Sequence, residues 1–171
     1  QMCIRDRLLL PLKLSIKGEH LTADFTGASS QVPAPVNSTL AVTAASVFIT
    51  LKSALDPKHA LNHGSFRPVT VIAPEGTIVN VTHPAPAGSH GEIRKRVIAC
   101  MLGALSQICP ELISADIHRT SFHNLIGGID PKTGQEFVHY EWSAGGNGGF
   151  QGADGPSVMA AIDWGDLSTA P

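Results

Sequence analysis

Three groups of polar residues have the side-chain types needed to bind a small polar substrate. The first group joins the carboxylate of Asp24 to two amides, Gln31 and Asn37, in a turn-rich segment. Asp and Asn also form hydrogen bonds with their own backbone in turns, and Asn frequently caps a helix. Residue types alone therefore favour turn and capping roles over a site here.

The second group brackets a short apolar stretch at 69–72. Arg67 precedes this stretch and Glu75 follows it. The planar guanidinium of Arg67 suits a carboxylate or phosphate ligand. A surface ion pair between Arg67 and Glu75 explains the same residues equally well, so both interpretations stay open.

The third group opens a predicted helix with His90, Glu92, Arg94 and Arg96. Glu92 suits the partial positive charge of a helix N-terminus, whereas the three cations Arg94, Lys95 and Arg96 oppose it. Free backbone amides together with Arg94 or Arg96 would make an anion site. The alternative is a solvated basic helix face, and we prefer that alternative.

A glycine-rich segment at 144–149 contains Asn147. It lacks the Lys-Ser/Thr pair that follows a phosphate-binding loop, so we interpret it as a turn that allows close backbone approach. The eight histidines show neither the spacing of a zinc site nor an HExxH pattern. The sequence therefore predicts no metal site within this chain.

The hydrophobic periodicity predicts the elements that must position these residues. A β-hairpin is expected at 12–25, and a helix capped by Asn37 or Ser38 should end at Asp56-Pro57. A strand at 69–72, an extended piece at 78–81 and a helix at 91–109 follow, with further strands at 122–129, 136–142 and 158–162. The fold class is therefore α+β, with short strands and two main helices in a partial domain.

Composition excludes several classes of protein. The 171 residues are 43% hydrophobic and 15% charged, with a formal net charge of −2. No basic surface for nucleic acid is indicated, and no apolar run approaches the roughly 20 residues of a membrane span. Cys3, Cys100 and Cys109 form no disulfide framework, which favours a reducing, cytoplasmic location.

The beginning of the chain differs in character from the rest. Residues 1–7 resemble the adapter-derived read-through seen in translated metagenomic assemblies, and we exclude them from the fold as a sequencing or assembly artefact. Residues 8–171 are then expected to be an internal fragment of a larger domain.

Read in order, the polar segments resemble those of the hydantoinase B family, which includes the B subunit of N-methylhydantoinase and the C-terminal half of 5-oxoprolinase. Asp24-Phe25-Thr26-Gly27 begins the match, and Asn62 through Pro68 continues it. The matching stretches are 24–37, 62–68, 73–76, 88–97, 103–111, 127–128 and 140–155.

The resemblance implies an ATP-dependent hydrolase that cleaves the C–N bond of a lactam or cyclic imide. ATP with Mg is expected on an A-type partner subunit or domain, giving a hetero-oligomer. A divalent metal is expected in the full-length protein, with its ligands upstream of Asp24 and outside this fragment, which should be inactive alone. The alternatives are an acetone carboxylase-like protein and a non-catalytic assembly module.

On the same resemblance, eight residues are expected to line or support the site, and no catalytic base is assigned. They are Asp24, Gln31, Asn37, Arg67, Glu75, His90, Arg94 and Asn147.

Overall fold

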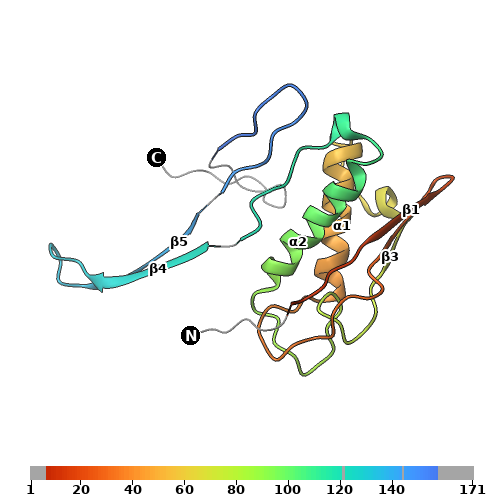
Figure 1. The fold of residues 1–171 in the computed structure, drawn as a ribbon. Coiled ribbons are helices and arrows are strands. Elements are labelled where there is room, and N and C mark those ends of the chain that lie inside the picture. Colours follow the sequence, from red (N-terminus) through yellow and green to blue (C-terminus); the bar gives the residue numbers. More distant parts are fainter. Residues whose placement is uncertain (1–6, 121, 144, 158–171) are drawn as a thin grey trace.

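The computed structural model describes residues 7–120, 122–143 and 145–157. Within these residues, two α-helices pack on one face of a three-stranded sheet, and a separate two-stranded hairpin extends away from this body (Figure 1). The arrangement confirms the predicted α+β class. The strand predicted at 158–162 and residues 1–6 lie outside the described residues.

The sheet begins with the predicted hairpin of β1 (Lys13–Lys17) and β2 (His20–Asp24). Gly18 has a φ of 58° in the two-residue turn between the strands, a conformation that glycine adopts without strain. Strand β3 (Val69–Ile72) pairs with β2 in parallel. A parallel pair needs a crossover connection, and the segment carrying the first helix supplies it.

Helix α1 (Leu40–Leu55) begins later than predicted. Thr39 is its N-cap, and the Thr39 hydroxyl accepts a hydrogen bond from the Val42 amide at 3.4 Å. The capping role predicted for Asn37 or Ser38 is therefore wrong, because both residues are fully buried before the helix starts. The helix ends as predicted, immediately before Asp56-Pro57.

Helix α2 (His90–Leu105) ends four residues before the predicted boundary. Residues 106–108 form a turn, and a short 3-10 helix, η2 (Pro110–Leu112), follows with Cys109 as its N-cap. Another, η1 (His63–Phe66), precedes β3, and its Phe66 ring stacks on Phe48 of α1 with centroids 4.3 Å apart.

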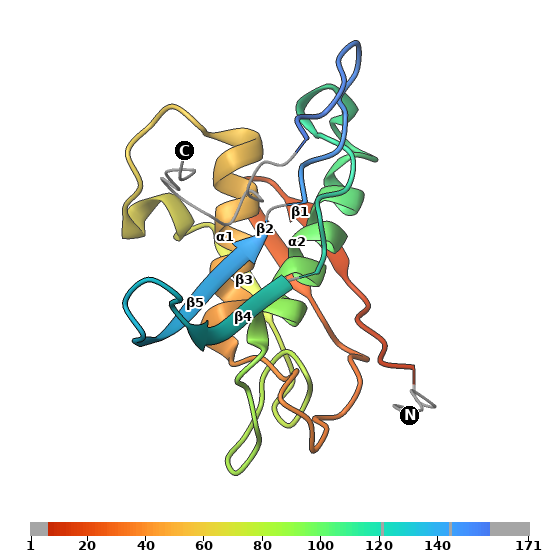
Figure 2. The ribbon, with the colours of Figure 1, turned by 90° about the vertical axis from the view of Figure 1, so that its left-hand side faces the viewer.

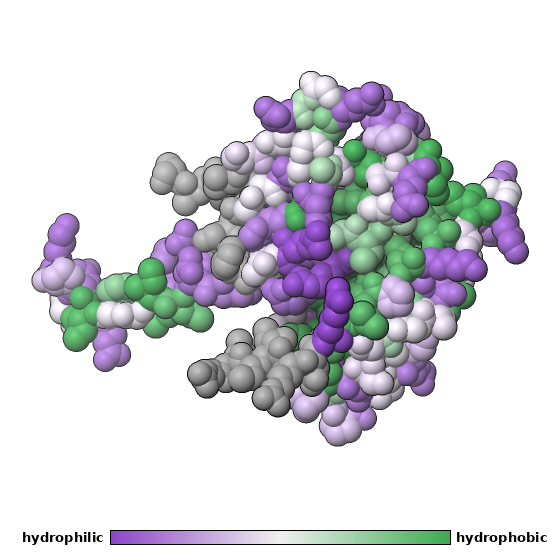
Figure 3. All heavy atoms as spheres, in the orientation of Figure 1, coloured by the Kyte–Doolittle hydropathy of each residue, from purple (hydrophilic) through white to green (hydrophobic). Residues whose placement is uncertain are grey.

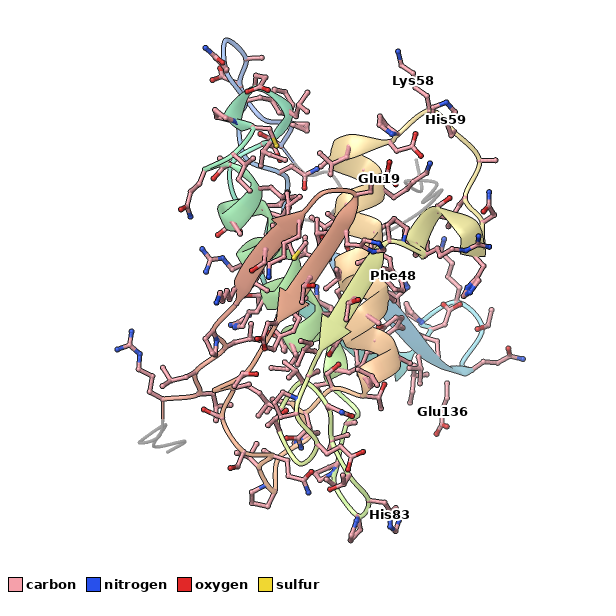
Figure 4. All side chains as sticks on the ribbon, turned by 90° about the vertical axis from the view of Figure 1, so that its right-hand side faces the viewer. Glu19, Phe48, Lys58, His59, His83 and Glu136 are labelled. Atoms are coloured by element: carbon pink, nitrogen blue, oxygen red, sulfur yellow. The ribbon has the colours of Figure 1, made fainter. Side chains whose placement is uncertain are left out.

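The core lies between the two helices and the inner face of the sheet. In Figure 4 the three strands lie in front of both helices, so their outer face points to the viewer. The buried apolar side chains come from β2, α1, α2 and the connecting segments; they include Leu21, Ala23, Phe25, Val47, Ile78, Val79, Val97, Ile98, Met101 and Leu105. Ile78 and Val79 belong to the predicted extended piece, which forms only isolated bridges at Thr77 and no strand.

The remaining two strands form what we call the arm. Strands β4 (Phe122–Ile129) and β5 (Glu136–Ser143) pair antiparallel along their whole length, which confirms both predicted strands. Figure 2 views the molecule from the side to which the arm points. Among the described elements, each arm strand makes its substantial contacts with the other arm strand alone.

Candidate functional site

Six of the eight expected site residues come from one end of the fold, where β2 and β3 end and both helices begin. We call residues 24–39 and 73–94 the loop end. In Figure 4, His83 marks the tip of the loop end, and Glu19 in the β1–β2 turn marks the opposite end of the sheet. The six residues are Asp24, Gln31, Asn37, Glu75, His90 and Arg94.

Asn37 holds the loop end together. Its side chain has no exposed surface. The amide nitrogen donates to the carbonyl oxygens of Val32, Ala34 and Pro86 at 2.8, 3.0 and 2.7 Å. Its Oδ1 accepts from the Val32 amide at 2.9 Å. Because backbone groups take up these bonds, the side chain positions two loops relative to each other.

Gln31 and His90 also hold the loop that contains Pro86, residues 82–89. The Gln31 Oε1 accepts from the Thr82 amide at 2.9 Å, and its Nε2 donates to the Thr82 carbonyl at 3.3 Å. The Nδ1 of His90, when it carries the proton, donates to the Ala87 carbonyl at 3.2 Å. The segment 82–89 is thus held at its start, middle and end by three residues chosen from sequence.

Two carboxylates lie at the strand ends of the loop end. Asp24 Oδ1 accepts from the Thr26 amide at 2.8 Å, as turn chemistry predicted. The hydrogen bonds from the Thr26 side chain and backbone lower the pKa of Asp24 below its usual value, so it is ionised at neutral pH. Asp24 pairs with Ile72, and Glu75 follows three residues later in an exposed turn. The ends of these parallel strands therefore bring two acidic groups to one edge.

Arg67 and Asn147 lie away from the loop end. Arg67 follows η1 at the start of β3, whereas Glu75 follows its end. The four residues of β3 span about 13 Å at the usual rise per residue, which argues against the ion pair considered from sequence. Asn147 forms a bridge with Ile117, in the segment between η2 and β4.

The basic start of α2 holds the chain that leads into the arm. Lys95 is only 3% exposed, and its Nζ donates to the Thr120 carbonyl at 3.1 Å. Arg96 donates to the Arg119 carbonyl at 3.1 Å and lies 3.5 Å from the Glu92 carboxylate. The preferred interpretation of a solvated basic face is therefore wrong for Lys95. We call these contacts of Lys95 and Arg96 with the carbonyls of Thr120 and Arg119 the Lys95 clamp. Arg94, which precedes Lys95 in the sequence, is half-buried.

The glycine-rich segment approaches the backbone of residues 115–118 very closely, as predicted. A Cβ on Gly148 would lie 2.5 Å from the Ala115 carbonyl carbon, and one on Gly155 would lie 2.1 Å from the Asn147 oxygen. Both obstacles are backbone atoms, so a side chain at either position would displace the segment.

This close packing forms one wall of a pocket of about 540 Å³ beside the second half of α2. Leu102, Ile113 and Phe150 give it an apolar lining, and an ion pair between Asp116 and Arg119 lies at its wall. Sequence reasoning missed this pocket because its walls are distant along the chain. The glycine cluster was the only local signal.

The described residues form no metal centre, and Cys100 is not an activated thiol. No group of three His, Cys, Asp or Glu side chains among the described residues is arranged to hold a metal ion. Cys100 and Cys109 are free thiols, and burial raises the pKa of Cys100, which opposes formation of a nucleophilic thiolate. No described helix combines the length and apolar character needed to cross a bilayer.

Comparison with known sequences gives consistent matches. The hydantoinase B/oxoprolinase family model matches residues 2–171. An uncharacterized protein of Methanocaldococcus jannaschii is 37% identical over 84% of this chain and 25% of its own length. The B component of a putative D-/L-hydantoinase from a Pseudomonas species is 29% identical over 91% of this chain and 26% of its own length. The 5-oxoprolinase PfmaA of Pestalotiopsis fici is 25% identical over 94% of this chain and 13% of its own length.

Two solved structures share the fold. The ATP-dependent caprolactamase of Pseudomonas jessenii superposes with a TM-score of 0.74 at 23% identity, covering 90% of this chain and 27% of that one. Nucleotide-free acetone carboxylase gives a TM-score of 0.77 at 19% identity, covering 91% of this chain and 22% of that one. The chain thus spans about a quarter of the length of the first curated relatives it matches.

Proposed function

The chain belongs to the hydantoinase B/oxoprolinase family, and from this we propose that it is part of the B subunit of an ATP-dependent cyclic amidohydrolase. The observation that carries the proposal is the match of the family model to residues 2–171. Relatives named as the B component of a hydantoinase and as a 5-oxoprolinase support it. The substrate class is a lactam or cyclic imide, and the reaction opens its C–N bond in the cytoplasm.

ATP coupling makes chemical sense for this substrate class. An amide carbonyl is a poor electrophile, and transfer of the γ-phosphoryl group to its oxygen makes the carbon easier to attack. One water then adds to the carbon and the C–N bond breaks, with the nitrogen taking up a proton. A second water releases phosphate, so the products are the ring-opened acid (an amino acid when the substrate is a lactam), ADP and phosphate.

We propose that the loop end forms part of the wall of the substrate site. Asn37 and Gln31 act as positioning residues, because their side chains hold the loops through backbone and Thr82 contacts. The exposed carboxylate of Glu75 and the half-buried ring of His90 are the groups best placed to meet a ligand. The described residues carry no cluster of metal ligands, so none of them is assigned as one.

An A-type, ATP-binding partner completes the proposal. The Pseudomonas hydantoinase component matches over 26% of its length, whereas the Pestalotiopsis 5-oxoprolinase matches over 13% of its length. The fungal enzyme is therefore about twice as long, which fits a single polypeptide that carries both an A-type and a B-type half. In the separate-subunit arrangement, ATP with Mg would bind to the partner.

A ketone carboxylase component is the second candidate function. The fold is shared as closely with acetone carboxylase as with the caprolactamase, with TM-scores of 0.77 and 0.74. The fold therefore does not separate an amide hydrolase from a carboxylase, and the reaction must be distinguished by assay.

The deciding experiment uses the full-length B-type protein purified with its A-type partner. ATP hydrolysis is measured with 5-oxoproline, a hydantoin, caprolactam, or a ketone plus bicarbonate. Stimulation by a cyclic amide with release of the ring-opened product is expected. Stimulation only by ketone and bicarbonate would replace the proposal with the carboxylase function.

A pair of variants tests the loop end in the same assay. Glu75→Gln is expected to reduce kcat/KM at least tenfold, because it removes an exposed carboxylate from the proposed site wall. Glu19→Gln, at the opposite end of the sheet, is the matched control and should leave activity unchanged. If Glu75→Gln, Arg67→Ala and Arg94→Ala preserve activity but weaken the A–B complex, this part of the chain is an assembly module.

A further inference from the structure

The arm has one apolar face and one mixed face. Residues directly opposite in an antiparallel pair lie on the same face of a sheet. One face therefore carries Leu125 opposite Tyr140, Val138 opposite Gly127, and Ile129 opposite Glu136, with His123 beside Tyr140 and hydrogen-bonded to its hydroxyl at 2.6 Å. We call Leu125, Ile129, Val138 and Tyr140 the apolar arm face; their exposed fractions are 68%, 66%, 76% and 52%.

The opposite face of the arm is different in character. It carries Asn124 opposite Glu141 and Ile126 opposite His139. Phe137 lies over Gly128 on this side, within 3.1 Å of the position that a Cβ would take. The exposed apolar surface is thus concentrated on one side of the ribbon, and Figure 3 shows hydrophobic atoms along the projecting arm.

An uncovered ribbon of this kind is a poor independent structure. A two-stranded hairpin alone is marginally stable in water and normally needs a third layer or strand. Here the base of the arm is nevertheless fixed, because Lys95 and Arg96 hold the carbonyls of Thr120 and Arg119 just before β4. The arm is held out from the body (Figure 1), and the side chains of its apolar face are exposed.

The size of the face decides what kind of partner covers it. Eight residue pairs give a ribbon about 26 Å long and about 10 Å wide, hence roughly 260 Å². A stable interface between separate chains buries about 800 Å² on each partner. This face alone is too small for a second copy or a separate chain, whereas a tethered segment benefits from a high effective concentration.

We propose that, in the full-length protein, an apolar surface from the part of the same polypeptide outside residues 1–171 packs on the apolar arm face. The relatives are about four times as long as the matched stretch, so ample chain exists to supply such a surface. This inference rests on the arm and the lengths of the relatives, and it does not depend on which reaction the enzyme performs.

The test measures thiol accessibility in the full-length protein without its partner. Val138→Cys and Ile126→Cys lie mid-arm on opposite faces, and maleimide labelling of each is followed by peptide mass spectrometry. The exposed fraction is 76% for Val138 and 53% for Ile126 when residues 1–171 stand alone. From these values, a cysteine at position 138 should label at least as fast as one at position 126. The proposal expects the reverse, with Val138→Cys labelling at least tenfold more slowly at every protein concentration.

Leu125→Cys, on the apolar arm face, repeats the measurement if Val138→Cys fails to fold, and labelling in denaturant checks that all thiols react equally. Equal, fast labelling on both faces would overturn the proposal, and so would equal protection of both. Protection that appears only at high concentration would identify a second copy as the occupant. Protection that appears only with the A-type partner would identify that partner instead, and either result rejects a cover from the same polypeptide.

Discussion

The buried amide of Asn37 joins two loops whose contacting residues are 49 positions apart in the sequence. Asn37→Asp keeps the shape of the side chain but directs a carboxylate oxygen at the three carbonyl oxygens that the amide now contacts. We expect a loss of roughly 3 kcal/mol of stability, because the donors are lost and a charge is buried without a partner. Hydrogen exchange of residues 82–89 in the full-length protein should accelerate.

Asn62→Asp is the matched control, because Asn62 is exposed and its side chain makes no cap hydrogen bond. Its effect should stay within about 0.5 kcal/mol. Equal effects of the two substitutions would mean that Asn37 does not hold the loops.

Asp56, at the end of α1, gives a prediction about acid. The Lys52 ammonium, 2.6 Å away, and then the His59 ring lower the pKa of Asp56 from 3.8 to about 2. A carboxyl whose pKa is lower in the folded state contributes stability above pH 3.8, and loses it as the pH falls through about 2. Asp56→Asn should therefore speed amide exchange at the end of α1 at neutral pH.

The difference between wild type and Asp56→Asn should close between about pH 4 and pH 2, the window set by the two pKa values. Asp154→Asn, in an exposed segment, serves as the comparison. A difference that stays constant down to pH 2 would mean that the Lys52 and His59 contacts do not form.

Six of the eight residues chosen from sequence lie together at the loop end, but residue types misjudged what some residues do there. The sequence could show that Asn37 precedes a helix, and capping is the commonest local role for such an Asn. It could not show that Pro86 would fold back onto the same amide, because that contact is not local. Lys95 was misjudged for the same reason: its acceptor on Thr120 is 25 residues away.

At the scale of elements, two glycines make a matched pair. Gly148→Ala should destabilise the 145–157 segment, because its Cβ would meet the backbone of Ala115 at 2.5 Å. Gly103→Ala, in α2, meets nothing within 4 Å and should stabilise the helix by about 1 kcal/mol. Thermal unfolding and exchange at 113–117 measure both, and equal effects would contradict the close packing.

The second prediction at the scale of elements concerns the Lys95 clamp. Lys95→Met keeps most of the buried apolar stem but removes the donor to the Thr120 carbonyl. A charge-assisted hydrogen bond of this kind contributes about 2 kcal/mol, and its loss should increase proteolysis and exchange at 119–124. Lys13→Met, on the exposed edge strand, should leave that segment unchanged.

Periodicity predicted the elements best where the pattern was long or bounded by turns. The first hairpin, both arm strands, both helices and β3 were found from alternation, helical spacing, and breakers such as Gly18 and Pro57. The end of α2 was overestimated because Ile108 continues the apolar spacing into the turns before Pro110. Residues 78–81 were predicted only as an extended piece and form no strand, because a short apolar run does not distinguish a strand from a buried loop.

At the scale of the whole molecule, the open arm predicts how this chain would behave in isolation. Residues 1–171 should self-associate weakly and in a concentration-dependent manner, because the apolar arm face is exposed but small. Val138→Lys should reduce this association, as measured by light scattering. Thr70→Lys, at an exposed position of β3, should not change it, and equal effects would exclude the arm as the contact surface.

Neither the pocket nor the one-sided apolar surface of the arm could be predicted from the sequence. The pocket needs α2 and residues 149–151 to meet, and no local pattern reports such a meeting. The arm strands were predicted, but the side of the ribbon that is apolar depends on which residues pair across it.

The Asn37 amide also limits how this end of the protein can be re-engineered. Because it ties residues 32–34 to Pro86, the two loops behave as one unit, and lengthening either would pull on the other. A graft intended to change substrate preference there should replace both loops together. The exposed stretch 57–62, by contrast, is a suitable place to insert a tag or a reporter.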